Sequence, residues 1–583
     1  MSRNDEVARR LEEFADLLEA QGVEYKPNAY RRAAENVREY PEPVEALAKG
    51  GEDAVAEIDR VGDAIAAKIV EYVQTGGIEE LDELREELPV DMAALTSVSG
   101  VGPKTVGTLY EVLSITTLEE LEAAAEAGEI REVKGFGAKT EENILENIPF
   151  ARKSQQRSRL GNARPVADAL LATLRESSAV EAAETAGSIR RWRETVGDVD
   201  VLVASTDGPA VLEAFTEWDA VDAVIESGTS KGSVRADGMR VDLRVVDPDE
   251  FGSALQYFTG SKDHNVHLRN LAIDRGLKMN EYGVFDVSDV DDPDADQRIG
   301  DRIAGETEAE MYDVLDLPLI PPELREDRGE IGAAQSGDLP DLVEPDDVRG
   351  DLHTHTDWSD GRESLETMVV AAEERGYDYY AVTDHAEGPG VFGNVGLSDA
   401  EIREQAEAVA SVAEEVDLEL FHGIEANIDA DGDVTTDDDV LAELDLVTAS
   451  PHSALDQTGQ TATERLCRAI EHPHVDVIGH PTGRIINSRP GLDVDVSRVV
   501  EAAADHGVAL EVNANPARLD LADESIRRCV EAGVPIVVNT DAHSPGEFDY
   551  VRYGVHTARR GWAEAADVLN TREVSAIRSF LEP

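Results

Sequence analysis

Apolar residues recur along this chain with two different periods, which divide it into two halves. In the first 150 residues the spacing is helical, as in the segment before Gly22, and predicts short amphipathic helices. The first of them is defined by Val7, Leu11, Phe14, Leu17 and Leu18. Beyond about residue 350, seven short apolar runs alternate with helical segments, so βα units closing into a barrel are expected.

Three segments of the N-terminal half share a turn-then-helix pattern at 60–73, 99–113 and 134–145. The second and third begin with Gly-apolar-Gly, whereas the first has Arg60 in place of the earlier glycine. Glycines allow a tight turn and a close approach to a ligand, and the helix N-terminus offers free N–H groups to an anion. The segments resemble helix-hairpin-helix motifs, which bind DNA phosphates through main-chain amides. The glycines concerned are Gly62, Gly100, Gly102, Gly135 and Gly137. Ordinary helix–helix turns are the alternative.

A pair of acids interrupts a run of valines in the segment GDVDVLV. On a strand, the spacing of Asp198 and Asp200 points both carboxylates to one face. Two adjacent carboxylates repel each other unless a cation lies between them, which favours a divalent metal site for Mg²⁺. Asp242, in the strand-like segment MRVDLRVV, could complete this site. Upstream, Gly187-Ser188 and two arginines, Arg190 and Arg191, are suited to a triphosphate.

Together with the segment YFTGS at 257–261, these acids resemble those of the family X DNA polymerases, over about residues 1–325. The resemblance implies two-metal nucleotidyl transfer on gapped or primed DNA with dNTPs. It also implies that Ser188 and Arg191 bind the triphosphate and that Tyr257 and Phe258 line the sugar pocket before Gly260. Asn265 would contact the base edge and Arg269 the template side.

The same resemblance bears on a lyase activity at the N-terminus. The family removes 5′-deoxyribose phosphate through a Schiff-base lysine after the first hairpin, and Lys68 lies at that position, with Lys26 at a second basic site. Ala64 and Arg60 depart from the family pattern, so both outcomes stay open for this activity.

The C-terminal half contains most of the histidines, and polar residues follow the end of each apolar run. Such residues meet at the carboxyl rim of a barrel. They are His353, His355, Asp360, His385, Glu425, His452, His480, Asp541 and His543. Six imidazoles and three carboxylates predict a multinuclear site for Mn²⁺, Zn²⁺ or Fe²⁺. Asp384 is expected to support it from outside. Other histidines, such as His422 and His556, are expected to be structural.

This set resembles the metal ligands of the polymerase and histidinol phosphatase (PHP) family, over about residues 346–583. The resemblance implies a distorted seven-stranded barrel with up to three Mn²⁺ or Zn²⁺ ions that hydrolyses phosphoesters. Fusion of the two halves is similar to bacterial and archaeal family X polymerases, in which the PHP domain is associated with manganese-dependent 3′→5′ exonuclease activity and, in some members, abasic-site cleavage.

The fold class expected is therefore multidomain. The boundaries predicted are a lyase-like helical domain at 1–88, a helix-hairpin-helix region at 89–150, an α+β nucleotidyltransferase palm at 151–250, a thumb at 251–318, a linker at 319–347 and a (β/α)7-like PHP barrel at 348–583. The linker is expected because that interval has little periodicity and many Pro, Gly and acidic residues.

Charge changes this picture in one respect. The formal net charge is −70, while 41% of residues are hydrophobic, which excludes a globally basic DNA binder and a disordered acidic chain. In molar salt the Debye length is about 3 Å, so dense like charges repel one another only weakly. We therefore interpret the acidic surface as an adaptation to high salt. Two cysteines exclude a disulfide framework. No signal or membrane segment is recognised, so a soluble cytoplasmic protein, working as a monomer, is expected.

Three functions follow in order of preference. The first is a gap-filling repair polymerase with an attached nuclease. The second is a PHP phosphoesterase or nuclease whose N-terminal half only binds DNA. The third is a DNA scaffold without catalysis, which requires that neither of the two complete sets of metal-binding residues is used.

Overall fold

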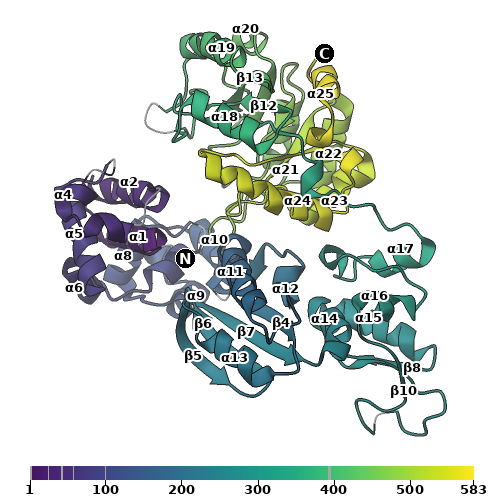
Figure 1. The fold of residues 1–583 in the computed structure, drawn as a ribbon. Helices are drawn as coiled ribbons and strands as arrows, with labels where there is room; N and C mark the ends of the chain where they lie inside the picture. The colour runs from purple at the N-terminus through teal and green to yellow at the C-terminus, as the bar shows by residue number, and fades with distance from the viewer. Residues whose placement is uncertain are drawn as a thin grey trace. The chain divides into compact units, whose positions relative to one another are not determined.

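The fold is described from a computed structural model of the 583-residue chain. The description covers all residues except 1–2, 24, 41–43, 57, 59, 99, 156, 294, 392–394 and 583. The chain divides into two compact units, residues 1–157 with 487–490 and residues 158–486 with 491–583 (Figure 1). None of the described helices is long and apolar enough to cross a bilayer.

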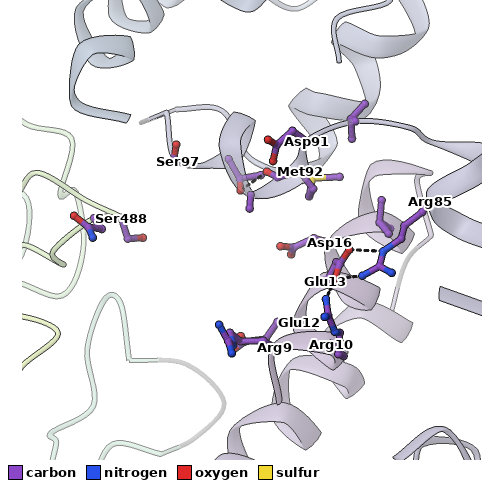
Figure 2. Close-up of a pocket in the computed structure, with 15 residues that line it drawn as sticks. Arg9, Arg10, Glu12, Glu13, Asp16, Arg85, Asp91, Met92, Ser97 and Ser488 are labelled. Atoms are coloured by element: carbon purple, nitrogen blue, oxygen red, sulfur yellow. Dashed lines mark hydrogen bonds and ion pairs between the residues drawn. The ribbon is translucent and has the colours of Figure 1, made fainter. Parts of the chain in front are cut away.

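The first unit is helical and built around one apolar core. Its helices are α1 (Arg3–Ala20), α2 (Lys26–Glu39), α3 (Val44–Ala48), α4 (Glu52–Val55), α5 (Asp63–Thr75), α6 (Glu79–Glu87), α7 (Met92–Thr96), α8 (Pro103–Leu113), α9 (Leu118–Glu126) and α10 (Ala138–Gln155). The spacing predicted for α1 is confirmed, and Phe14 stacks on Tyr30 of α2 with 4.5 Å between ring centroids. Figure 2 shows a pocket beside α1, where Arg85 donates hydrogen bonds to both carboxylate oxygens of Glu13.

The second unit begins with a five-stranded sheet in the order β2-β4-β7-β6-β5. Its strands are β2 (Ala182–Thr185), β4 (Val199–Ala204), β5 (Val221–Ser227), β6 (Lys231–Ala236) and β7 (Met239–Val246), and β1 (Ser158–Arg159) pairs with β3 (Thr195–Val196) beside it. β4 and β7 are parallel neighbours at the centre, whereas the other pairs are antiparallel. Helices α11 (Leu160–Glu176) and α13 (Gly208–Thr216) cover one face, and α14 (Phe251–Thr259) packs on Leu202 of the other.

A smaller α+β region follows, with its own apolar core. Its elements are α15 (Lys262–Ile273), the antiparallel strands β8 (Leu277–Asn280), β9 (Gly283–Asp286) and β10 (Asp301–Ala304), α16 (Glu308–Asp313) and α17 (Glu330–Ser336). The interval 319–347, expected to be a linker, contains α17 and buries Ile320, Leu324 and Ile331 in this core. Single apolar residues between prolines and acids create these contacts, which explains why no periodicity is visible there.

The C-terminal part is a sheet of seven parallel strands in sequence order, as predicted. The strands are β11 (Gly350–Asp351), β12 (Tyr379–Val382), β13 (Glu419–Asn427), β14 (Leu446–Ser450), β15 (Val477–Ile478), β16 (Ala509–Asn513) and β17 (Ile536–Asn539). The helices are α18 (Leu365–Arg375), α19 (Asp399–Ala413), α20 (Asp438–Leu441), α21 (Gly459–Ile470), α22 (Val496–His506), α23 (Asp523–Ala532), α24 (Val551–Arg560) and α25 (Val574–Leu581). A bridge between Thr354 and Ala542 joins the first and last strand regions beyond their ends, so the sheet is nearly closed.

Candidate active sites

The central strands of the first sheet bring three predicted acids together. Asp200 of β4 is the direct register partner of Asp242 in β7, and Asp198 immediately precedes β4. Carboxylate oxygens of all three lie within 4.8 Å of one another. As predicted, Val199, Val201 and Val203 are buried in the core on the other face. The alternating valines therefore predict the strand, and residues two apart on a strand point to the same face, which brings Asp198 and Asp200 together.

The electrostatics of this cluster fit a divalent cation. Burial, with the charges of Asp198 and Asp242, raises the pKa of Asp200 to about 7. The guanidinium Nε of Arg240 lies 3.0 and 2.9 Å from the two oxygens of Asp242 and acts as a stand-in cation. Three carboxylates this close together, one of them with a pKa raised by burial and by its two neighbours, are a hard-oxygen donor set.

A tight turn places the predicted triphosphate residues beside these acids. Gly187 has φ +60°, and a Cβ at this position would lie 2.1 Å from Oδ2 of Asp200, so the close approach requires glycine. Ser188 follows in the single turn α12 (Gly187–Arg190). Arg190, the last residue of this turn, pairs with Glu308 of α16. Burial would raise the pKa of Glu308, but Arg325 and Arg190 outweigh burial and lower it to about 2.

Arg191, the second arginine of the predicted triphosphate site, is engaged by the protein itself. Its Nε donates to Glu326 at 3.0 Å and its Nη1 donates to the carbonyl of Thr259 at 2.6 Å. Burial lowers the pKa of Arg191, and Glu326 opposes this effect. Arg560 of α24 also donates to Glu326, at 3.2 Å, and to the carbonyl of Arg191 at 2.7 Å. A residue of the C-terminal barrel thus supports the loop of the first sheet.

The remaining substrate candidates lie on α14 and α15. The rings of Tyr257 and Phe258 meet edge to face with centroids 5.1 Å apart. Asn265 is used within the protein, because its amide donates to the carbonyl of Tyr257 at 2.7 Å and its oxygen accepts from Gln256. The side-chain oxygen of Asn265 also lies against Gly260, because a Cβ at residue 260 would be 2.4 Å from that oxygen. Arg269, on the same helix α15, is exposed.

The three hairpins of the first unit have the local geometry that the glycine pattern predicts. Helices α5, α8 and α10 begin directly after the later glycine of each segment, Gly62, Gly102 and Gly137 respectively. Gly100 and Gly135 have φ +83° and +101°. Arg60, which replaces glycine in the first hairpin, adopts φ +60°. The turn is therefore retained there although a side chain makes its conformation costly.

Lys68 lies on α5, and its surroundings hold its amine in the charged state. Its Nζ pairs with Glu80 and lies 5.3 Å from the ring centroid of Phe14. Burial alone would lower its pKa, but Glu80 and Tyr30 outweigh burial and raise it. A Schiff base requires the neutral amine, so this environment disfavours the nucleophile. Lys26 begins α2 and is exposed.

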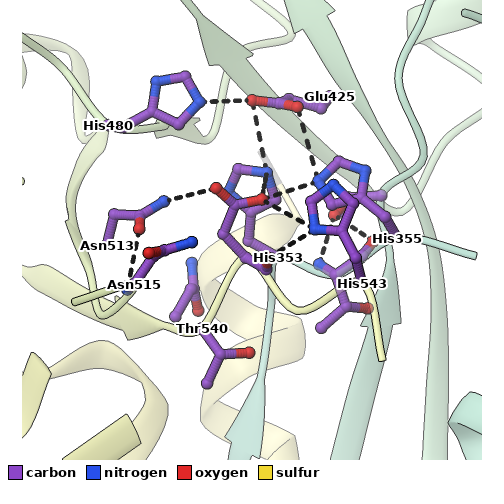
Figure 3. A network of polar contacts seen from close by, with 12 residues as sticks. His353, His355, Glu425, His480, Asn513, Asn515, Thr540 and His543 are labelled. Carbon is purple, nitrogen blue, oxygen red and sulfur yellow. Dashed lines mark hydrogen bonds and ion pairs between the residues drawn. The ribbon is translucent and has the colours of Figure 1, made fainter. Parts of the chain in front are cut away.

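All nine predicted residues of the barrel gather at the carboxyl ends of its strands. Figure 3 shows five of them, His353, His355, Glu425, His480 and His543. Glu425 of β13 is the centre, with the ring nitrogens of five histidines within 3.7 Å of its oxygens. These are His353, His355, His385, His452 and His480. Asp360 lies 3.3 Å from Nε2 of His543, and Asp541 lies 3.0 Å from Nε2 of His355. His353 and His355 follow β11 rather than lie within it, because that strand ends at Asp351.

Protonation in this cluster follows from charges that burial forces together. Burial would raise the pKa of Glu425, yet the imidazoles around it hold that pKa well below its usual range. Burial would lower the pKa of His543, but Asp360 raises it to about 9. The pKa of His452 is instead lowered to about 4, since the effect of burial outweighs the attraction to Glu425.

Unpartnered polar atoms show that this cluster fits metal ions. Several buried ring nitrogens, and Oε2 of Glu425, make no hydrogen bond with any described residue, although some of these atoms lie at ion-pair distance from one another or from Asp541. They include Nε2 of His353, both ring nitrogens of His355, and Nδ1 of His385 and His480. Buried polar atoms are normally paired, so this convergence is the donor set of an N/O metal centre.

A second set of buried polar groups orients these side chains. Nδ1 of His353 donates to Glu511 of β16 at 2.7 Å, and the backbone N–H of His480 donates to the same carboxylate at 2.6 Å. Nδ1 of His452 donates to Asn427 at 2.7 Å. Sequence reasoning missed Glu511 and Asn427. The signal available was a polar residue inside an apolar strand, as in VALEVNAN.

Asp384, expected to support the cluster, is fully buried and binds the loop after β11. It accepts hydrogen bonds from the backbone and hydroxyl of Thr356, from Ser359 and from Gln405. Two of the histidines expected to be structural are satisfied by protein groups. His422 contacts Gln405, and His556 bonds Glu323.

Comparison with known proteins agrees with this geometry. Family models match a helix-hairpin-helix domain at residues 2–78, a SAM-like helix-hairpin-helix tandem at 92–148, a DNA polymerase beta thumb at 254–326 and a PHP domain at 351–515. The chain is 36% identical over 583 residues to the DNA polymerase/3′-5′ exonuclease PolX of Bacillus subtilis, covering 99% of each chain. The chain belongs to the family X DNA polymerases that have a C-terminal PHP domain.

More distant relatives match parts of this family X chain. DNA polymerase lambda of Rattus norvegicus is 25% identical over 344 residues, covering 55% of this chain and 56% of its own length. A probable phosphatase of Shewanella loihica is 34% identical over 214 residues, covering 34% of this chain and 81% of its own length.

Proposed function

We propose that this protein is a DNA-directed DNA polymerase that fills gaps during repair and also removes nucleotides as a 3′→5′ exonuclease. The observation that supports it most is the convergence of Asp198, Asp200 and Asp242 beside the positive-φ turn at Gly187. The name of the Bacillus subtilis relative, DNA polymerase/3′-5′ exonuclease PolX, supports both activities.

In the polymerase site, Asp198, Asp200 and Asp242 would hold Mg²⁺. The ions, when bound, would supply charge neutralisation for the attacking hydroxyl and the pyrophosphate leaving group. The backbone amides and hydroxyl of Gly187-Ser188 then orient the triphosphate, and Arg191 exchanges its contact with Glu326 for phosphate oxygens. Tyr257 and Phe258 place the sugar, with Gly260, Asn265 and Arg269 beyond them on the base and template side.

In the PHP site, the nine clustered residues would hold up to three ions, Mn²⁺ or Zn²⁺, which supply Lewis acidity and an activated water for phosphoester hydrolysis. Glu511 and Asn427 keep the ligand histidines in the tautomer that directs the free ring nitrogen to the centre. The hairpin glycines Gly62, Gly100, Gly102, Gly135 and Gly137 would bind the DNA backbone. The boundaries predicted from the sequence are retained as proposed domains, except that residues 319–347 join the preceding α+β region instead of forming a linker.

A gapped-duplex assay with separate Mg²⁺ and Mn²⁺ conditions tests the assignment. Asp198→Ala should lose primer extension and keep nuclease activity, whereas His353→Ala should show the reverse pattern. Asp219→Ala, an exposed acid of the same palm, is the matched control and should keep both. If neither catalytic substitution removes an activity, the assignment fails.

The second candidate is a PHP phosphoesterase or nuclease that binds DNA without polymerising. The contact of Arg191 with Glu326 and the carbonyl of Thr259 favours it, since both occupy the guanidinium. So does the printed name of the Shewanella relative, a probable phosphatase. If wild-type protein hydrolyses phosphoesters but incorporates no dNTP, the second candidate function is supported.

We also propose that the protein is halophilic and acts as a cytoplasmic monomer. Counterion release normally makes DNA affinity collapse with salt. The net charge of −70 predicts instead that activity persists in molar KCl and that structure is lost in dilute buffer. Equal thermal stability at low and high KCl would contradict the salt adaptation, and light scattering would test the monomer.

A further inference from the structure

An arginine that belongs to none of the predicted sites lies at the rim of the PHP cluster. Arg518 is in the loop between β16 and α23, and its Nε lies 3.7 Å from Oδ2 of Asp541. This separation exceeds hydrogen-bond length. The guanidinium makes no hydrogen bond with any described residue, and its side chain is 23% exposed. Its donors are therefore available on the solvent side of the cluster.

The loop that presents Arg518 is held by its backbone. Arg484 donates from Nε to the carbonyl of Arg518 at 2.9 Å and from Nη2 to the carbonyl of Leu519. The side-chain oxygen of Asn515 accepts from the N–H of Ala517 at 3.0 Å. These bonds fix the Cα of Arg518 while its side chain remains free to bind a ligand.

The palm supports the same loop from its other side. A Cβ on Gly161, in α11, would lie 2.5 Å from Cβ of Pro516, so helix and loop are in contact only because residue 161 is glycine. Glu194, immediately before β3, pairs with Nη1 of Arg484 at 2.8 Å. Residues outside the PHP domain thus determine where Arg518 lies.

Charge decides what this arginine can do. A phosphodiester approaching the cluster meets the carboxylates of Asp360, Glu425 and Asp541 on a chain of net charge −70. A planar guanidinium binds two phosphate oxygens side by side, which a lysine cannot do. Asp541, one of the residues that would hold an ion, has its Oδ2 3.7 Å from Nε of Arg518, so a phosphate bound at this side of the cluster would be within reach of the guanidinium.

We propose that Arg518 binds the phosphate of the bond cleaved in the PHP domain, and that Gly161 and Glu194 of the palm position it. This inference rests on the proposed nuclease function. It adds a substrate-binding cation and makes the position of that cation depend on the palm.

The experiment uses full-length protein with Mn²⁺ and a chromogenic phosphodiester, thymidine 5′-monophosphate p-nitrophenyl ester. Arg518→Ala should lower kcat/KM by about 10- to 100-fold, the effect of losing a charge-assisted bidentate contact. Bound manganese per protein should not change, Arg518→Lys should recover part of the loss, and millimolar guanidinium should partly rescue Arg518→Ala. The matched control is Arg468→Ala, which removes a surface arginine paired with Asp433.

Wild-type kinetics in Arg518→Ala would overturn the proposal. So would a loss of manganese that parallels the loss of activity, because Arg518 would then only balance the charge of Asp541. Failure of the nuclease function itself gives a different pattern, in which wild type and His353→Ala are equally inactive on the diester. That result would overturn the nuclease function and the role of Arg518 with it.

Discussion

Replacing Asp200 by Asn should stabilise the metal-free palm while it destroys the polymerase site. Burial, with Asp198 and Asp242, raises the pKa of Asp200 from 3.8 to about 7. The folded state therefore binds a proton that the unfolded state has released, and stability falls as pH rises through the window between these values. Above about pH 7 the full cost of burying the charge is present, and Asn does not incur it.

The magnitude follows from the part of this window that an experiment can cover. From about pH 5.5 to the folded pKa is about 1.5 units, at about 1.4 kcal/mol per unit. The stability advantage of Asp200→Asn should therefore grow by about 2 kcal/mol between about pH 5.5 and pH 8, or about 30-fold in amide protection. High KCl should reduce the repulsion from Asp198 and Asp242, but not the effect of burial.

Hydrogen exchange of peptides from β4 and β7, in EDTA, measures this local stability in both proteins at each pH. Asp219→Asn, at an exposed position of the same palm, is the control and should show no pH-dependent advantage. Adding Mg²⁺ should protect the wild type more than Asp200→Asn. An advantage of the same size at both pH values, or none at about pH 8, would refute the reasoning about the buried charge.

Three further substitutions test particular contacts. Gly187→Ala places a Cβ 2.1 Å from a metal-site carboxylate at φ +60°, and should reduce primer extension at least about 100-fold while phosphodiester hydrolysis persists; equal extension would contradict the turn geometry. Gly161→Val should displace Pro516 and lower nuclease kcat/KM about tenfold with little loss of bound manganese, and unchanged kinetics would show that the loop yields. Glu80→Gln should lower the pKa of Lys68 and increase borohydride trapping on abasic DNA relative to wild type, whereas trapping that stays absent in both proteins would exclude Lys68 as a lyase nucleophile.

Much of the fold could be predicted because periodicity and local chemistry agree. The valines of GDVDVLV place Asp200 on a strand face opposite the core, and seven apolar runs in the C-terminal half correspond to seven parallel strands. The nine residues of the PHP cluster could be predicted because they lie near or beyond the carboxyl ends of strands, and parallel strands end at one rim.

What the sequence could not provide depends on contacts between distant segments. Arg191 is a candidate for triphosphate from its position after Gly187-Ser188, but its contact with Glu326 lies 135 residues away. Glu511 is 158 residues from its partner His353. In the interval 319–347, isolated apolar residues reach the core between prolines and acids, which no period records.

The contact of Arg560 with the nucleotide loop has an evolutionary consequence. Arg560 binds Glu326, the carbonyl of Arg191 and Asp523 at once, so a single side chain of the barrel satisfies groups from both halves of the chain. Because these contacts join the polymerase half to the PHP barrel, exchanging one half between relatives would disrupt them. A chimera that joins the palm of one member to the barrel of another would lose the hydrogen bonds that Arg560 donates to Glu326 and to the carbonyl of Arg191, unless its barrel also has an arginine at the end of the corresponding helix.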